Sequence, residues 1–394
     1  PMLVLAGAGS GKTKVLTNRI AYLIENGVSE DNILAITFTN KASKEMRERE
    51  VKILGKLAYD IQISTFHSFG LKLLKEKYGV LGYSKNFNIL DSDDSLTVIK
   101  KIIKELNLNP KFYNAREIKS KISSAKNELI DIDSFSKMEY DNNILLIYKK
   151  YLNKLKVNNS VDFDDLLVLP IKLFREHKDI LEYYQDKYKY VLIDEYQDTN
   201  EAQYMLSKLL CQKHRNIFVV GDNDQSIYAF RGANYKNILN FEKDYKDCEV
   251  ILLEENYRST KNILDVANSV IKHNKDRKDK NLKSNNGIGE KVKYVKVETD
   301  KDECSYVSSK INELHNSGVR YEDIAVLYRT NAQSRILEEE MLKNGIPYRI
   351  VGSFYFYNRK EIKDLLCYLR LINNPLDDVS LLRVINTPKR GIGD

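Results

Sequence analysis

A chain of 394 residues predicts two or three domains and is long enough to bury a sizeable core. It contains 30% charged residues and neither an apolar run of membrane-spanning length nor a secretory leader pattern, which argues against a membrane or exported protein. The net charge of +7 mildly favours a polyanionic partner. Its 4 cysteines are scattered without C-x-x-C spacing, so we expect reduced thiols, a cytoplasmic location, and neither a zinc site nor disulfides.

The first predicted element is a buried strand, "MLVLA" (2–6), followed by "GAGSGKT" (7–13) and a stretch with apolar residues at helical spacing. A strand, a glycine-rich turn and a helix form a phosphate-binding loop, in which backbone N–H groups converge on the anion. Lys12 is suited to reach the β- and γ-phosphates, and the Thr13 hydroxyl is suited to ligate Mg²⁺. The cofactor-binding residues predicted here are Ala6, Gly7, Ala8, Gly9, Ser10, Gly11, Lys12 and Thr13.

Ala6 stands where the usual phosphate-loop pattern begins with glycine. Alanine adds one methyl group and removes no N–H donor from the loop. We therefore expect the loop to bind nucleotide despite this departure. The competing interpretation is a flexible glycine-rich turn with an incidental Lys-Thr pair.

Further apolar segments alternate with helical stretches and predict a parallel sheet covered on both faces, as in an α/β nucleotide-binding domain. Residues 85–161 differ, being rich in Lys and Asn and helical in pattern, which predicts an all-helical insertion. Its acidic run "DSDDS" (91–95) is interpreted as a helix N-cap instead of a metal cluster. The predicted strands are 33–38, 61–65, 189–195, 216–222 and 249–255.

After residue 260 the pattern predicts a helix, a charged linker at 272–289 that is solvated, and a second α/β domain. The linker's alternative interpretation is a nucleic-acid-binding tail. The domains expected are a nucleotide-binding domain over 1–260, with its core at 1–84 and 162–260, and the first part of a second domain over 261–394.

The Asp-Glu pair in "VLIDEYQD" (191–198) ends an apolar strand, at the sheet edge where ligands of open α/β sheets bind. Asp194 is suited to hold Mg²⁺ together with Thr13. Glu195 is suited to orient or deprotonate an attacking water. A solvated acidic strand end is the simpler interpretation, but the phosphate loop makes it the weaker one.

Two later segments reach the same edge. "VGDNDQSIYAFRGA" (220–233) contributes Gln225, which can hydrogen-bond a γ-phosphate or the water, and Arg231. "ENYRS" (255–259) contributes Tyr257 as a stacking face for a base and Arg258 as a cation facing the transferred phosphoryl group. Either segment alone is a weak signal.

Taken together and in order, these motifs resemble those of the UvrD/Rep/PcrA group of superfamily 1 DNA helicases, and most of all its PcrA-like members. The resemblance covers essentially the whole chain and includes alanine at the first loop position. The motifs are "AGAGSGKT" (6–13), "ITFTNKA" (36–42), "STFHS" (64–68), "DFDDL" (162–166), "IDEYQD" (193–198), "GDNDQSIYAFRGA" (221–233), "LEENYRS" (253–259) and "VLYRTNAQSR" (326–335).

The resemblance implies two RecA-like domains with ATP and Mg²⁺ between them, and ATP-driven 3′→5′ movement on single-stranded DNA in repair or replication. Lys12, Glu195, Gln225 and Arg258 become the catalytic set, with Arg258 as an arginine finger and Tyr257 against adenine. Its implied DNA-contacting residues are Phe38, Asn40, Thr65, His67, Tyr228 and Phe230, with Arg329 and Asn331 from the second domain. Single-stranded DNA and its junctions with duplex are the implied partners, besides repair or replication proteins.

Three departures from the family pattern stand out. Both ends lack a cap or tail, so we expect a fragment of a longer protein, without the family's upstream adenine-reading Gln and its later motifs, including a second arginine finger. The family's usual Trp in the DNA-stacking segment is Phe230 here, in a chain without Trp. The first two put this fragment's own activity in doubt, and the third reduces a stacking surface.

Other functions compete with a helicase. A helicase part of a RecB/AddA-type helicase–nuclease has similar motifs, and a nuclease domain would distinguish it. A DNA-binding accessory module with a degenerate ATPase is disfavoured by the intact Lys12, Asp194, Glu195, Gln225 and Arg258. A nucleotide kinase does not account for "DEYQD" followed by "QSIYAFRG".

Overall fold

The computed structural model describes residues 1–394 except 140, 276, 279, 352–359 and 393–394. The chain divides into two compact units, Pro1–Glu290 with Asp364–Asp394, and Lys291–Lys363. This division differs from the boundary at residue 260 expected from the sequence, which stays a prediction. Within the described ranges, no helix combines the length and apolar character that a membrane crossing needs.

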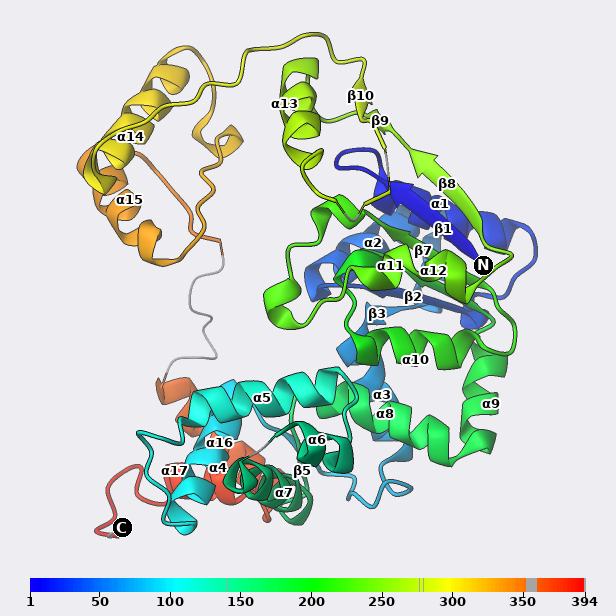
Figure 1. The fold of residues 1–394 in the computed structure, drawn as a ribbon, viewed down its shortest axis with the longest axis vertical. Helices are drawn as coiled ribbons and strands as arrows, with labels where there is room; N and C mark the ends of the chain where they lie inside the picture. Colours follow the sequence, from blue (N-terminus) through cyan, green and yellow to red (C-terminus); the bar gives the residue numbers. More distant parts are fainter. Residues whose placement is uncertain (140, 276, 279, 352–359, 393–394) are drawn as a thin grey trace. The chain divides into compact units, whose positions relative to one another are not determined.

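A six-stranded sheet in the order β3-β2-β6-β7-β1-β8 forms the centre of the first unit, and all its neighbouring strands are parallel (Figure 1). This confirms the parallel α/β sheet and the six strands expected from the sequence. The strands are β1 (Met2–Ala6), β2 (Ile33–Thr37), β3 (Gln62–Thr65), β6 (Tyr190–Ile193), β7 (Ile217–Gly221) and β8 (Glu249–Leu253).

The sheet is buried on both faces because alternate side chains of each strand enter different cores. In β1, Leu3 and Leu5 join one hydrophobic core, whereas Val4 and Ala6 join the core on the opposite face. Helices α1 and α2 cover the face of Val4, and α3 and α8–α12 cover the face of Leu3. Their bounds are α1 (Lys12–Glu25), α2 (Asn40–Leu54), α3 (Phe66–Lys77), α8 (Asp165–Glu176), α9 (Lys178–Lys187), α10 (Glu201–Cys211), α11 (Lys236–Leu239) and α12 (Phe241–Asp244).

The helical insertion has a hydrophobic core of its own, built by four helices. Asp91 caps the first of them, accepting hydrogen bonds from the backbone of Asp93 and Asp94, while the Asp94 carboxylate accepts from the Asp91 N–H. The acidic run is therefore an N-cap, as the sequence indicated. The insertion comprises β4 (Asn88–Ile89), α4 (Ser92–Glu105), α5 (Ala115–Asn127), α6 (Ile132–Met138), α7 (Asn142–Val157) and β5 (Ser160–Val161).

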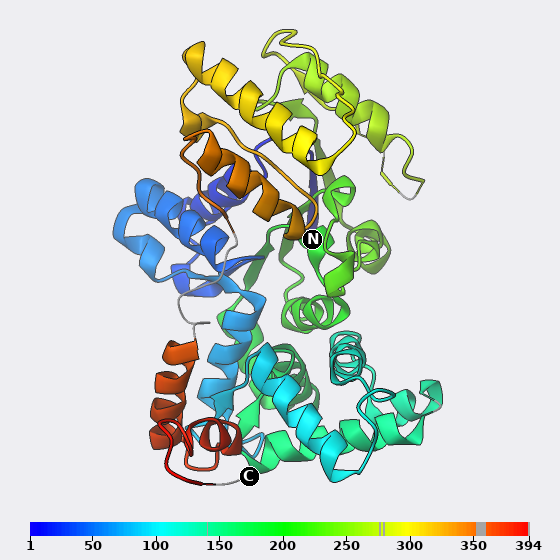
Figure 2. The ribbon, with the colours of Figure 1, turned by 90° about the vertical axis from the view of Figure 1, so that its left-hand side faces the viewer.

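Two late helices, α16 (Lys360–Asn373) and α17 (Asp378–Val384), pack on this insertion (Figure 2). Arg370 donates to the buried Asp94 carboxylate over 2.7 Å, and the Asn88 amide donates to Asp377 over 2.6 Å. These contacts could not be predicted from the sequence, because hydrogen bonds between distant polar residues leave no periodic pattern.

The second unit contains α14 (Asp300–Asn316) and α15 (Ala332–Lys343), which are helices of the region expected to form a second α/β domain. The second α/β domain expected after residue 260 needs strands, but the apolar segments 291–297 and 323–329 form no strand in this described part of the chain. The strand expectation is therefore wrong here. An extended segment such as that beginning at Ile324 becomes a strand only when a neighbour completes its hydrogen-bond ladder.

Candidate nucleotide site

The loop between β1 and α1 has the backbone of a phosphate cradle. Gly9 and Gly11 have φ values of +69° and +93°, a left-handed conformation that glycine adopts without strain. Helix α1 begins at Lys12, so its N-terminal N–H groups face the loop. Ala6 ends β1 with no exposed surface and packs in the core with Leu16 and Ile20. Its methyl group is therefore accommodated in the core, which explains why alanine fits at this position.

Lys12, Glu195 and Gln225 meet at the carboxyl edge of the sheet. The Lys12 Nζ atom lies 3.0 Å from Gln225 Oε1 and 3.2 Å from Glu195 Oε2. The Lys12 side chain is only 11% exposed, so these contacts fix the ammonium group in a partly desolvated position. Three residues that sequence reasoning chose from separate motifs are thus brought together by the fold.

The Asp-Glu pair follows β6 in a constrained backbone. Glu195 has a φ of 50°, uncommon for a residue with a side chain, and its N–H donates to Asp194 Oδ1 over 3.0 Å. Burial, with the Glu195 charge as a smaller cause, raises the pKa of Asp194 to about 6. The same two causes raise the pKa of Asp198 to about 6, and its buried Oδ1 atom has no hydrogen-bond partner among the described residues.

These crowded carboxylates fit a divalent cation. Among the described residues, no group of three or more His, Cys, Asp or Glu side chains is placed to hold a metal ion. That is compatible with Mg²⁺, which takes one or two protein ligands and completes its shell with phosphate oxygens and water. Thr13 and Asp194 lie on the two elements that border the site, at the start of α1 and the end of β6.

The 255–258 segment is attached to the phosphate loop. The Tyr257 N–H donates to the Gly9 carbonyl over 3.0 Å, and a Cβ on Gly9 would lie 2.7 Å from the Arg258 Cβ. Tyr257 is 67% exposed, which leaves its ring available for stacking, and Arg258 is also exposed.

Arg231 ends a short 3-10 turn after β7, and its side chain lies outside the described residues.

Sequence reasoning missed Asn256, which makes this attachment. Its buried amide donates to the Ala8 carbonyl and accepts from the Arg258 and Ser259 N–H groups over 2.9 and 2.7 Å. One sequence signal could have identified this role: an Asn side chain that begins a turn often accepts a hydrogen bond from the backbone N–H two residues later.

Gln197 was missed as well. It is 1% exposed, donates to Glu195 Oε2 over 2.9 Å, and accepts from the Asp222 N–H over 2.9 Å. Gly221 makes room for it, since a Cβ there would lie 2.6 Å from Gln197 Oε1. Nothing in the local sequence identifies this role, because the partner Asp222 lies in the loop after β7, 25 residues further along the chain.

The charged linker is only partly solvated, so that expectation is wrong in part. Residues 272–275 are exposed, but the side chains of Lys280 and Arg277 are 3% and 9% exposed. Both pair with Asp224, over 2.6 and 3.0 Å, and Lys280 also pairs with Asp222. A run of charges predicts solvation only when no opposite charges face it, and here the loop after β7 supplies them.

Three aromatic rings from two motifs form a row beside this site. Phe38 lies 4.8 Å from Tyr228, and Tyr228 lies 6.1 Å from Phe230, between ring centroids. Phe230 is 69% exposed. Phe230 therefore does not belong to the hydrophobic core, and its ring is accessible to a ligand.

The remaining expected DNA residues of the first unit lie close to one another. Thr65 caps α3 by accepting from the Ser68 N–H, and Ser68 donates to Asn40 over 3.4 Å. His67 stacks on Phe163 with 4.0 Å between ring centroids, and burial lowers the pKa of His67 to about 4. His67 is thus a neutral, stacked ring.

In the second unit, Arg329 and Asn331 are both exposed at the start of α15.

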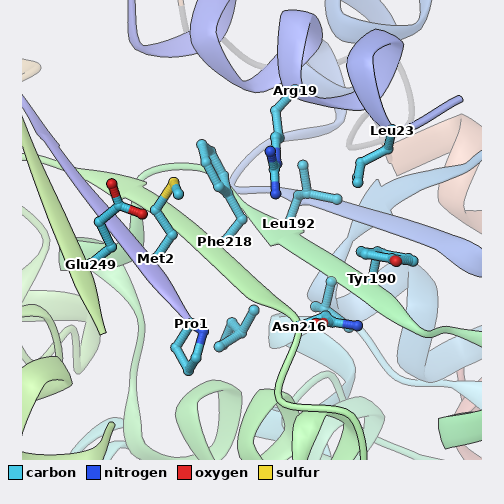
Figure 3. Close-up of a pocket in the computed structure, with 11 residues that line it drawn as sticks. Pro1, Met2, Arg19, Leu23, Tyr190, Leu192, Asn216, Phe218 and Glu249 are labelled. Carbon is cyan, nitrogen blue, oxygen red and sulfur yellow. The ribbon is translucent and has the colours of Figure 1, made fainter. Parts of the chain in front are cut away.

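A hollow of about 240 Å³ is found at the opposite edge of the sheet (Figure 3). Met2, Tyr190 and Phe218 line it, close to where β1, β6 and β7 begin. Phosphate ligands of parallel sheets bind at the carboxyl ends of strands, so this hollow is distinct from the nucleotide site.

Comparison with known families agrees with this geometry. The UvrD/REP helicase N-terminal domain matches residues 1–246, and the UvrD-like helicase C-terminal domain matches residues 251–394. The chain belongs to the UvrD/REP helicase family. The resemblance inferred from the sequence is thereby confirmed, as is the α/β fold with a parallel sheet.

Among individual UvrD/REP relatives, the chain is 55% identical to the ATP-dependent DNA helicase PcrA of Bacillus subtilis, over 100% of this chain and 54% of the relative. It is 51% identical to PcrA of Staphylococcus epidermidis and 50% identical to PcrA of Staphylococcus aureus, with the same coverage. The chain spans about half the length of the curated relatives it matches.

Proposed function

We propose that this chain is the ATP-hydrolysing part of an ATP-dependent DNA helicase that moves 3′→5′ on single-stranded DNA and acts in DNA repair or replication. The observation that carries the proposal is the meeting of Lys12, Glu195 and Gln225 within 3.2 Å at the carboxyl edge of the sheet. Family membership and the similarity to proteins named ATP-dependent DNA helicase support it.

We assign each residue of the proposed nucleotide site a role in ATP binding or hydrolysis that fits its position. The loop of residues 6–13 would bind the phosphates of ATP, with the Lys12 ammonium at the β- and γ-phosphates, where it would exchange its contacts with Glu195 and Gln225 for phosphate oxygens. Glu195 would accept the proton of the attacking water, and Gln225 would hydrogen-bond the γ-phosphate or that water. Tyr257 would stack on adenine, and Arg258 and Arg231 would contribute positive charge near the phosphates.

Thr13 and Asp194 would hold Mg²⁺. When bound, this ion would neutralise charge on the phosphate oxygens. The charge of this ion would also favour the ionised forms of Asp194 and Asp198, whose pKa values burial raises to about 6.

Single-stranded DNA is the proposed partner, including its junctions with duplex. The exposed ring of Phe230 and the half-buried rings of Phe38 and Tyr228 are suited to stack on bases. Thr65, Asn40, His67 and the exposed Arg329 and Asn331 are the further DNA contacts we propose. We also propose the division into a nucleotide-binding domain over 1–260, with its insertion at 85–161, and the first part of a second domain over 261–394.

The test is ATP hydrolysis by the full-length protein with and without single-stranded DNA. Lys12→Ala removes the cation at the site where phosphate charge develops and should abolish hydrolysis. Glu195→Gln should retain ATP binding and lower turnover by about 10²- to 10⁴-fold, the usual contribution of a general base. Lys14→Ala is the matched control, because Lys14 is an exposed lysine two residues further along α1 and has no expected role.

Near-normal hydrolysis in a folded Lys12→Ala protein would contradict the phosphate-loop assignment. DNA binding by the natural protein without any ATP hydrolysis would instead favour an accessory module.

A further inference from the structure

Lys12, Gln225, Asp222, Gln197 and Glu195 form a closed ring of polar contacts. Lys12 contacts Gln225, the Gln225 amide donates to the Asp222 carboxylate, and the Asp222 N–H donates to Gln197. Gln197 then donates to Glu195, which contacts Lys12. The ring fixes the proposed base and the proposed γ-phosphate sensor relative to one another.

Lys280 is not a member of this ring but binds one of its members, Asp222. Its ammonium group contacts Asp222 Oδ1, while the other carboxylate oxygen of Asp222 accepts from Gln225. It also pairs with Asp224 over 2.6 Å, and Arg277 pairs with the same carboxylate over 3.0 Å. These four charged side chains are each no more than 9% exposed, so solvent screens them little.

The segment 280–284, here called the strap, places Lys280 there. Its short strand β10 (Lys283–Ser284) pairs with β9 (Glu255–Asn256), next to Tyr257 and Arg258 (Figure 1). Leu282 packs on the phosphate loop, where a Cβ on Gly7 would lie 2.2 Å from its Cδ2 atom. The strap therefore contacts three of the segments that build the nucleotide site.

We propose that Lys280 is a positioning residue for ATP hydrolysis: it holds Asp222, and through Asp222 it orients the Gln225 amide at the proposed γ-phosphate position. The inference rests on the proposed function of this site. Without the Lys280 cation, Asp224 keeps only its pairing with Arg277, and Asp222 is a buried carboxylate that has lost its ion pair. The loop carrying Gln225 then loses its fixed position. A misplacement of about 1 Å can cost about 10²-fold in rate.

The experiment compares Lys280→Gln, Lys280→Arg and Lys275→Gln in the full-length protein. Lys275 is an exposed lysine earlier in the charged linker, and its substitution removes the same single charge. Lys280→Gln should lower kcat for ATP by about ten- to hundredfold, with KM changed less than about threefold. Lys280→Arg keeps the cation and should restore most of kcat, and Lys275→Gln should match the natural protein.

A second measurement does not depend on turnover. Hydrogen exchange of the backbone amides of residues 222–226 should quicken in Lys280→Gln and stay unchanged in Lys275→Gln, with protection of the sheet strands retained in both. Unchanged exchange in that loop, or an unchanged kcat, overturns the role of Lys280. If the natural protein hydrolyses no ATP, the proposed function fails, and the exchange measurement alone decides whether Lys280 holds the loop.

Discussion

At the scale of single residues, burial determines the chemistry of several carboxylates. Glu50 on α2 has no exposed surface, and neither of its carboxylate oxygens has a hydrogen-bond partner among the described residues. Burial raises the pKa of Glu50 from 4.5 to about 8. The folded protein therefore binds a proton there that the unfolded chain releases, so this group's contribution to stability is complete below about pH 4.5 and is lost as the pH rises through about 8.

Glu50→Gln should remove this dependence, because the amide does not ionise. Relative to the natural protein, the free energy of unfolding of the variant should rise between pH 5 and pH 8 by at most about 1.4 kcal/mol per pH unit. Chemical denaturation at several pH values measures it. Glu48→Gln, at an exposed position of the same helix, should show no such trend. Parallel curves for Glu50→Gln and the natural protein would mean that Glu50 titrates normally.

At the scale of elements, the loop after β7 connects the nucleotide site to the aromatic row. Gln225 ends a short 3-10 turn, and Tyr228 and Phe230 follow within five residues. Under the proposed function, a displacement of Gln225 by the γ-phosphate would move these rings relative to the bound bases. The two proposed contacts, with the γ-phosphate and with DNA bases, thus lie in one short loop, which supports the proposal that hydrolysis is coupled to movement on DNA.

Phe230→Ala should weaken binding of single-stranded DNA by about 1–3 kcal/mol, the usual value of one base stacked on an aromatic ring. Phe230→Trp offers a larger face and should tighten binding modestly. Fluorescence anisotropy with a labelled oligonucleotide measures both, and ATP hydrolysis without DNA should stay unchanged in both. Because Phe230 is 69% exposed, unfolding of Phe230→Ala is not expected. Unchanged DNA affinity would show that Phe230 does not stack on bases.

At the scale of the whole molecule, a buried ion cluster joins the insertion to the sheet domain. Lys126 of α5 contacts Asp162 over 2.6 Å and Asp165 over 2.8 Å, and the Tyr151 hydroxyl donates to Asp162 over 2.9 Å. The side chain of Lys126 is 3% exposed. The hydrophobic core of the insertion and that of the sheet are therefore connected by charged side chains that are almost fully buried.

Lys126→Met should lower the free energy of unfolding by about 3–5 kcal/mol, because it leaves two carboxylates buried without their cation. Chemical denaturation measures the loss. Lys121→Met on the same helix breaks an ion pair in which the lysine is 49% exposed, and should cost about 0–1 kcal/mol. Equal effects of the two substitutions would show that the Lys126 cluster adds nothing to stability.

The sequence by itself determined the six strands, the phosphate loop, the helical insertion and the family, because each rests on local apolar periodicity or on ordered motifs. It also identified Lys12, Glu195 and Gln225 as one site, since the carboxyl ends of parallel strands share an edge.

Only the tertiary structure decided the roles of Gln197, Asn256 and Lys280, the burial of Glu50, and the packing of α16 and α17 on the insertion. Each depends on a partner on another element. A lysine in a charged stretch looks solvated until an acidic loop from 56 residues earlier in the chain faces it, as Asp224 faces Lys280. Burial and pairing at such a distance are properties of the fold, and local sequence patterns do not encode them.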